Sequence, residues 1–265
     1  HQDLEWVRKR TYEAYAKHYT MAWPFEEHSS GRPFQQSPIY ENLKNANACF
    51  GEKLGWERPN WFAPKSMEPV DHYTYDRQNW FEIVGEEVKA AREKAVLIDQ
   101  TSFAKFEISG PQALDALEYL CANNINKGIG STIYTQMLNN HGGIECDVTI
   151  TRIEDDCFYL VTGTGFMTHD FDWIKSNLTE FPDVKIENVT YQNSVFSLMG
   201  PNSRQILEKV SSNDLSNEKF PFATAQSVNI GDKIVRAIRI TYMGELGWEL
   251  HFPIEDANYL YDKLF

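Results

Sequence analysis

The chain has 265 residues, of which 38 are acidic and 25 basic, so its formal net charge at pH 7 is −13. This charge argues against binding to nucleic acid or to anionic lipid, because both need a basic face on the protein. Hydrophobic residues make up 42% of the sequence, which is enough for a sizeable core and excludes a disordered tail.

The sequence also indicates whether the chain crosses a membrane, in which compartment it occurs and whether it binds a metal. No apolar run approaches the roughly 18 residues of a membrane helix, and the N-terminus lacks the plan of a signal peptide. Four cysteines without a CxxC pair and seven histidines without metal-ligand spacing favour a reducing compartment, with neither disulfides nor a metal site. We expect a soluble, intracellular piece of a longer protein, from a bacterial cytoplasm or a mitochondrial matrix.

The first eighty residues are predicted to be partly helical and partly irregular. Apolar residues at helical spacing predict a helix over residues 1–22, which ends before Pro24. Ser37 and Pro38 are typical of a helix start and predict a second helix to about residue 46. Tryptophans and prolines dominate residues 49–80, and we interpret this stretch as an irregular strap laid over a core and as the domain boundary.

From residue 81 onward the helical and strand patterns are clearer. Phe81, Val84, Val88, Ala91 and Ala95 follow one another at steps of three or four, which predicts an amphipathic helix. A strand at residues 103–108, a break at Gly110-Pro111 and a leucine-bearing helix then follow.

From this strand onward, the chain contains two segments that resemble each other at an offset of 90 residues. Phe106–Pro111 resembles Phe196–Pro201, and Phe158–Val161 matches Trp248–His251. The helices that follow each copy match at the same offset, which favours duplication over coincidence. We therefore predict an α+β fold of two strand–helix–strand–strand–helix units about a pseudo-twofold axis, with a pocket where they meet.

A strand in the first unit carries two acids on one face. Residues 139–143 form a turn sequence, and residues 144–151 after it alternate strictly. Cys146 would face one side, and Glu145 and Asp147 the other. These carboxylates either meet solvent or point into a cleft, where one could hold or move a proton on a basic nitrogen.

In the second unit the corresponding turn carries Glu245 between Gly244 and Gly247, which suggests a tight backbone with an aimed carboxylate. Such a group accepts two parallel N–H bonds from an aminopyrimidine edge or a guanidinium, and the alternative is a solvent-facing turn residue. Two GxG sequences are present, but neither completes GxGxxG and no Walker A sequence occurs, so we expect no dinucleotide fold.

Five motifs together resemble the C-terminal half of the dimethylglycine/sarcosine dehydrogenase family, namely Phe50–Phe62, Leu97–Lys105, Tyr134–Asn139, Gly142–Asp147 and Tyr242–Glu249. That half is similar to the T-protein (aminomethyltransferase) of the glycine cleavage system, and the similarity covers nearly the whole chain. It implies a small helical and irregular domain at residues 1–62, of the FAD-dependent oxidoreductase central type. A folate-binding aminomethyltransferase domain at residues 63–265, incomplete at its C-terminus, would follow.

The resemblance also implies cofactors and partners. In this family an N-terminal half with covalent FAD oxidises an N-methyl amine. The C-terminal half binds tetrahydrofolate, which captures the one-carbon unit as 5,10-methylenetetrahydrofolate. Tetrahydrofolate would thus bind this chain and FAD a missing N-terminal domain, so the partners are folate, the one-carbon donor and that flavin domain. The alternatives are a non-catalytic regulatory or assembly module, as in a related phosphatase regulatory subunit, and a free-standing aminomethyltransferase, which residues 1–62 disfavour.

Site residues follow from the resemblance motif by motif. Asp147 matches the catalytic aspartate that orients folate and manages the proton at its reacting nitrogen. Glu245 matches the glutamate that holds the pterin's amino edge. The other matching positions are the strand end along the pterin and a pocket wall, namely Val161, Thr162, Gly163 and Tyr134. T-proteins have two adjacent aspartates here, whereas this chain has Cys146 before Asp147, and Glu145 on the same face could partly replace the missing acid.

Overall fold

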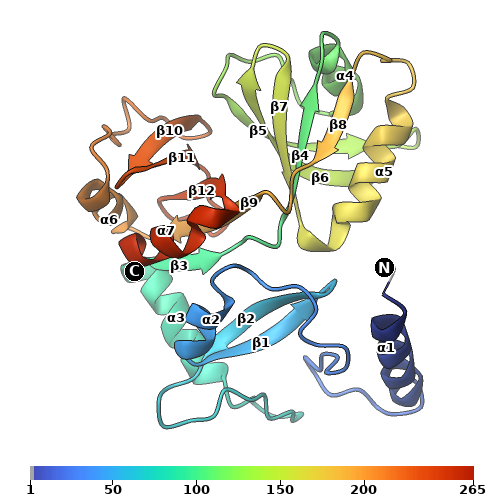
Figure 1. The fold of residues 1–265 in the computed structure, drawn as a ribbon, viewed down its shortest axis with the longest axis vertical. Coiled ribbons are helices and arrows are strands. Elements are labelled where there is room, and N and C mark those ends of the chain that lie inside the picture. The colour runs from blue at the N-terminus through green and yellow to red at the C-terminus, as the bar shows by residue number, and fades with distance from the viewer. Residues whose placement is uncertain (1–2) are drawn as a thin grey trace. The chain divides into compact units, whose positions relative to one another are not determined.

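A computed structural model describes residues 3–265 of the chain, which divide after Ala90 into two units (Figure 1). The first unit contains the helices α1 (Leu4–Lys17) and α2 (Tyr40–Asn45), a hairpin of β1 (Ala48–Lys53) and β2 (Trp56–Phe62), and most of α3 (Phe81–Glu93). The three helices expected in this region are confirmed, with narrower bounds. None of the helices in residues 3–265 has the length and hydrophobicity that a bilayer crossing requires.

The interpretation of residues 49–80 as an irregular strap is wrong for their first part. The backbone turns between β1 and β2 at Leu54 and Gly55, with φ of 48° and 87°, as a tight hairpin requires. Pro59 lies beside a shift in the strand register, where its missing N–H is tolerated. Pro59 therefore marks a bulged hairpin, and apart from its turn at residues 54–55, residues 63–80 are the part of this stretch without helix or strand.

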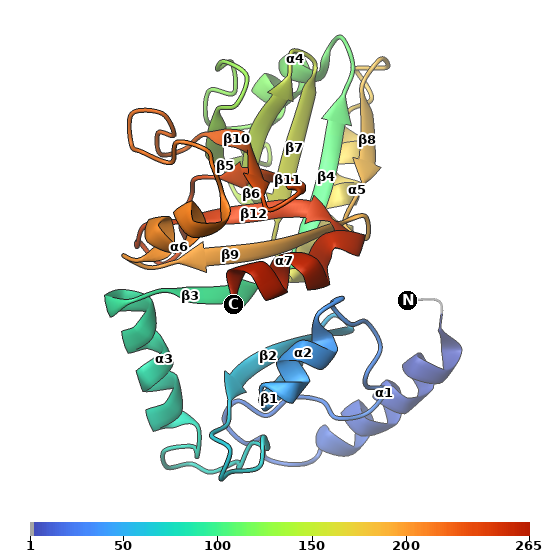
Figure 2. The same ribbon diagram turned by 60° about the vertical axis from the view of Figure 1, so that its left-hand side comes forward.

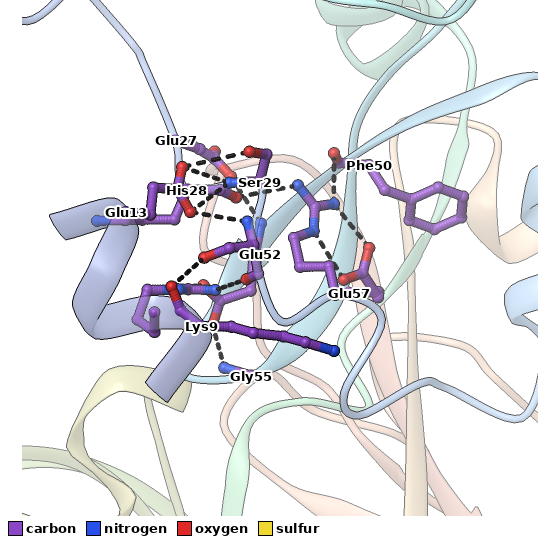
Figure 3. Close-up of polar contacts among 12 residues, drawn as sticks. Lys9, Glu13, Glu27, His28, Ser29, Phe50, Glu52, Gly55 and Glu57 are labelled. Carbon is purple, nitrogen blue, oxygen red and sulfur yellow. Dashed lines mark hydrogen bonds and ion pairs between the residues drawn. The ribbon is translucent and has the colours of Figure 1, made fainter. Parts of the chain in front are cut away.

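Charged side chains attach α1 and the loop after it to this hairpin (Figure 3). Arg10 pairs with Glu52 at 2.6 Å, and Arg32 donates two hydrogen bonds to Glu57, at 2.7 and 2.8 Å. Glu57 is buried, so losing its partner would leave a charge without compensation. No residue of α1 is buried. These ion pairs, more than apolar packing, therefore hold the N-terminal segment in the first unit.

The second unit contains two five-stranded antiparallel sheets, in the orders β5-β6-β7-β4-β8 and β10-β11-β12-β9-β3. The strands of the first sheet are β4 (Ala104–Ser109), β5 (Thr132–Leu138), β6 (Ile144–Glu154), β7 (Cys157–Thr162) and β8 (Lys185–Asn188). Those of the second are β3 (Val96–Asp99), β9 (Asn193–Met199), β10 (Ala225–Ile230), β11 (Lys233–Ile238) and β12 (Gly247–Pro253). The accompanying helices are α4 (Ala113–Leu120), α5 (Met167–Asn177), α6 (Ser203–Val210) and α7 (Ala257–Leu264).

The duplication is confirmed, and the two repeats exchange strands. β3 precedes β4 in the chain but pairs with β9, whereas β8 precedes β9 but pairs with β4. Each repeat therefore supplies an edge strand to the other sheet. The observed unit is strand–strand–helix–strand–strand–strand–helix, so the predicted unit lacks this edge strand and one of the three strands after the helix.

Two separate apolar layers hold this unit together. α4 and α5 cover one face of the first sheet and bury a large cluster that includes Phe106, Leu117 and Ile150. On the other face, Tyr159 and Val161 of β7 pack in one cluster with Ile238 of the second sheet. Figure 2 shows β9 and β12 running across the direction of β4 and β7. The two sheets thus meet face to face at this second cluster.

Candidate functional site

Asp147 lies on the face of the first sheet that turns toward the second sheet. From Cys146 onward β6 alternates as predicted, with Cys146, Val148 and Ile150 buried under the helices and Asp147 exposed on the opposite face. The expectation that Glu145 shares the Asp147 face is wrong, because a shift in the register skips Glu145 and its carboxylate lies 3.5 Å from His169 of α5. Thr149 pairs in register with Val161, which belongs to the cluster between the sheets. Asp147 is two residues from Thr149 on the same strand, so it shares that face.

Two side chains of β5 lie beside the Asp147 carboxylate. Gln136 lies directly opposite in the register, and its Nε2 donates a hydrogen bond to Asp147 Oδ1 at 2.9 Å. The same carboxylate lies beside the phenol of Tyr134 and raises its pKa. A smaller part of this pKa rise comes from Tyr242. Tyr242 belongs to the Gly-Glu turn, which connects β11 with β12 in the second sheet.

Glu245 sits in this turn and forms an ion pair. Arg92 Nη1 lies 2.9 Å from Glu245 Oε1 and also donates to the Met243 carbonyl at 3.1 Å. The guanidinium is one of the two partners that the sequence suggested for this carboxylate. The two flanking positions require glycine for different reasons. Gly244 has a φ of 82°, whereas a Cβ at Gly247 would lie 2.2 Å from the Met199 sulfur.

The end of β7 presents its side chains in two directions. Val161 belongs to the inter-sheet cluster and so shares the Asp147 face. Thr162 points the other way, and its hydroxyl donates to Asp170 Oδ2 at 2.6 Å. Gly163 ends the strand, and a Cβ there would contact the Phe166 ring at 3.3 Å. Of these three, Val161 offers its side chain to the proposed folate face, and Thr162 and Gly163 can offer only backbone.

The structure brings the predicted residues together only in part. Tyr134, Asp147 and Val161 lie on one face of the first sheet. Glu245 makes no hydrogen bond or ion pair with Asp147, and its partner is Arg92. A hollow of about 280 Å³ lies where the sheets meet, but it is lined by other residues, including Arg152 and Arg236.

Sequence reasoning missed three members of this neighbourhood. The turn at residues 139–143 alone would pair Gln136 with Cys146, and only the register shift beside the turn brings it opposite Asp147. Arg92 looks like any outward charge of an amphipathic helix, and its partner comes 153 residues later. Tyr242 has no local signal beyond a position next to the Gly-Glu turn.

Two family models match the sequence. The model described as "FAD dependent oxidoreductase central domain" matches residues 1–37. The model described as "GCVT N-terminal domain" matches residues 39–265. The two matched segments meet near residue 38, and the structural units divide after Ala90. The boundary that we placed between residues 62 and 63 stays a prediction.

Known relatives and a solved structure support the same assignment. The chain is 36% identical to mouse (Mus musculus) dimethylglycine dehydrogenase over 262 residues, which are 98% of this chain and 30% of the relative. It is 35% identical to mouse sarcosine dehydrogenase over an alignment of 287 positions, which covers 94% of this chain and 31% of that relative. The chain thus spans less than a third of these relatives.

The fold is similar to that of the glycine cleavage system aminomethyltransferase T from Bartonella henselae. The TM-score is 0.71 at 24% identity, with 87% of this chain and 57% of that chain covered. This likeness confirms the predicted fold class, and the family matches confirm the resemblance read from the motifs. The chain therefore belongs to the GCVT N-terminal domain family, here preceded by a segment of the FAD-dependent oxidoreductase central domain.

Proposed function

We propose that this chain is the tetrahydrofolate-binding, one-carbon-accepting part of a longer FAD-dependent dimethylglycine or sarcosine dehydrogenase. Its product would be 5,10-methylenetetrahydrofolate. The observation that carries the proposal is the Asp147 carboxylate, exposed on the sheet face, oriented by a hydrogen bond from Gln136 and lying beside Tyr134. The family match and the two mouse relatives support it.

Asp147 is suited to manage a proton at a bound amine. Bound tetrahydrofolate supplies the nucleophilic nitrogen, and a one-carbon electrophile held beside it reacts faster than in dilute solution. A carboxylate has about four acceptor positions, of which Gln136 uses one. The remaining positions can accept an N–H of the ligand. Asp147 would then take up the proton that leaves the nitrogen.

Glu245 is suited to hold the flat edge of a pterin. Oε1 pairs with Arg92, and Oε2 has no hydrogen-bond partner among residues 3–265. A carboxylate can serve a guanidinium and an aminopyrimidine edge at once through its two oxygens. Tyr134 and Val161 would form the walls between this end and Asp147.

The N-terminal segment supports a flavin-domain partner. Apolar side chains along α1 and just after it are exposed, with Leu4 82%, Tyr15 67% and Tyr19 75% accessible. This segment matches the central domain of FAD-dependent oxidoreductases, so we propose that a flavin domain of the longer protein covers these side chains. The four cysteines are unpaired, in keeping with a reducing compartment such as a bacterial cytoplasm or mitochondrial matrix.

The proposal is tested by the fate of the oxidised methyl group in the full-length enzyme. With a formaldehyde scavenger present, wild-type protein should transfer the carbon to tetrahydrofolate, and Asp147→Asn should do so at least tenfold less per amine oxidised, because general acid–base help is worth about 10²–10⁴ in rate. Asp155→Asn is the matched control, since its side chain is 92% exposed on the turn after β6. Equal transfer by wild type and Asp147→Asn would remove Asp147 from the mechanism. No transfer by wild type would favour the non-catalytic module.

A further inference from the structure

A cluster of three unlike metal-ligand side chains lies on the face of β6 opposite Asp147. Cys146 comes from β6, and His169 and Asp170 come from the first turn of α5. One ligand atom from each lies within 4.8 Å of those of the other two. We propose that Cys146, His169 and Asp170 bind one divalent transition-metal ion, with zinc as the preferred ion.

The proposal departs from the expectation that the chain has no metal site. That expectation considered spacing along the sequence, and Cys146 and His169 are 23 residues apart on different elements. α5 packs against β6, so the fold brings the two together. Thiolate, imidazole and carboxylate are the groups that zinc takes as ligands in proteins.

The distances within the cluster are close to those of a tetrahedral site. His169 Nδ1 lies 2.9 Å from Asp170 Oδ1, and Cys146 Sγ lies within 4.8 Å of a ligand atom of each. Zinc bond lengths place neighbouring ligand atoms roughly 3.4–3.6 Å apart. An ion at the centre therefore needs only small side-chain shifts, while the strand and helix keep their places. On binding, the thiol proton would pass to solvent as the sulfur–metal bond forms.

The groups around the cluster are arranged as an outer shell. His169 Nε2 lies 3.5 Å from Glu145 Oε2, and Asn139 holds Glu145 through a 2.8 Å hydrogen bond. Metal-binding histidines usually donate their second N–H to a carboxylate in this way, which leaves the other nitrogen for the ion. The hydroxyl of Thr162 likewise occupies Asp170 Oδ2 and leaves Oδ1 toward the cluster.

Two of the three proposed ligands are buried, and the third is exposed to solvent. Cys146 and Asp170 are each 1% exposed, whereas the His169 side chain is 51% exposed. The buried Asp170 carboxylate has His169 beside it at 2.9 Å, and a bound cation would take over the role of its positive partner. The ion would enter from the His169 side, and its fourth position would face that side, where water can occupy it.

Equilibrium dialysis of the full-length protein against Zn²⁺, with elemental analysis, tests the proposal. Wild type should bind one more zinc per chain than the Cys146→Ser and His169→Gln variants do, and each variant should weaken this binding at least 100-fold. Glu145→Gln should weaken it about 10–100-fold, the usual effect of an outer-shell change. Cys157→Ser and His141→Gln are matched controls away from the cluster and should bind as wild type does.

Binding of Co²⁺ gives a second readout. The spectrum of the cobalt-loaded protein minus that of the metal-free protein should show a cobalt–thiolate absorption band in wild type and in Cys157→Ser. The band should be absent in Cys146→Ser. Circular dichroism of each metal-free variant establishes that it is folded. Zinc bound equally by wild type, Cys146→Ser and His169→Gln, or not bound by folded wild type, would overturn the proposal. Because this cluster and Asp147 lie on opposite faces of β6, such a failure would leave the folate proposal standing.

Discussion

The two repeats share one plan but differ where the candidate site lies. In the first repeat β6 is 11 residues long, carries Glu145 and Asp147, and meets β7 through a short turn. In the second repeat β11 is 6 residues long, and the longer connection to β12 holds Tyr242 and Glu245. The duplication thus provides the scaffold, and the candidate functional residues occur where the copies have diverged.

The largest expected effect tests what the repeats have in common. Gly110 and Gly200 occupy equivalent turns of the two repeats, with φ of 131° and 122°. A Cβ at Gly110 would lie 2.0 Å from the Asp183 carbonyl oxygen, and a Cβ at Gly200 would lie 2.6 Å from the Lys94 carbonyl oxygen. Gly110→Ala and Gly200→Ala should each lower the free energy of unfolding by at least about 3 kcal/mol, because backbone must move and the alanine is strained. Urea unfolding measures this loss.

The control for these variants is Gly128→Ala, where the added Cβ meets nothing within 4 Å and φ is not positive. It should change the free energy of unfolding by no more than about 0.5 kcal/mol. If the two turn variants matched this control, the shared turn would not be the element that places the exchanged strands.

The second prediction concerns a charge that one repeat buries and the other lacks. Lys105 is fully buried where the second repeat has Val195, and its Nζ donates to the Thr101 and Asn193 carbonyls. Burial lowers the pKa of Lys105 from 10.5 to about 7. Between those two values the unfolded chain binds more protons than the folded one, so stability should rise with pH, by up to about 1.4 kcal/mol per unit.

Urea unfolding at pH 7 to 9 measures this slope. Lys105→Met should reduce the slope, whereas Lys175→Met, a change on the outer part of α5, should leave it as in wild type. An identical slope in wild type and Lys105→Met would show that the buried amine does not titrate in this range.

Much of the fold, and less of the site, could be predicted from the sequence. Glycines at one offset and apolar residues at helical spacing identified the repeats and their helices. The exchanged strands β3 and β8 have only four residues each, too few for alternation to be visible. The hairpin at residues 48–62 was missed because Pro59 and the tryptophans suggested irregular structure.

Site contacts depend on pairs that no local pattern links. The Asp147 face was predicted because alternation along β6 sets it. The pairing of Glu245 with Arg92 arises only when α3 and the turn before β12 are both folded. The cluster of Cys146, His169 and Asp170 is equally invisible, since it joins a strand to the helix behind it.

A smaller effect separates the two ends of the candidate site. Glu245→Gln should weaken binding of tetrahydrofolate by roughly 1–3 kcal/mol, because a neutral amide replaces a charge-assisted acceptor. Isothermal titration calorimetry measures the change. Glu255→Gln, a similar exchange in the second repeat beyond β12, is the control and should bind as wild type does. Unchanged affinity in Glu245→Gln would remove this residue from the pterin end.

The smallest effect concerns the ion pair across the turn. The Arg92 side chain is 58% exposed, so its pair with Glu245 should contribute no more than about 1 kcal/mol to stability. Arg92→Gln should therefore leave urea unfolding nearly unchanged, and added salt should shrink any difference. A loss well above 1 kcal/mol would mean that the turn depends on this pair for its structure.

The central claim is that the diverged parts of both repeats bind one folate molecule. Its most direct test is equilibrium binding of 5-formyltetrahydrofolate, which cannot react further, to full-length wild type, Asp147→Asn, Glu245→Gln and the double variant. We expect saturable binding of one ligand per chain in wild type, weaker binding in each single variant and the weakest in the double variant. Absence of saturable binding in wild type, or equal affinity in all four proteins, would contradict the claim.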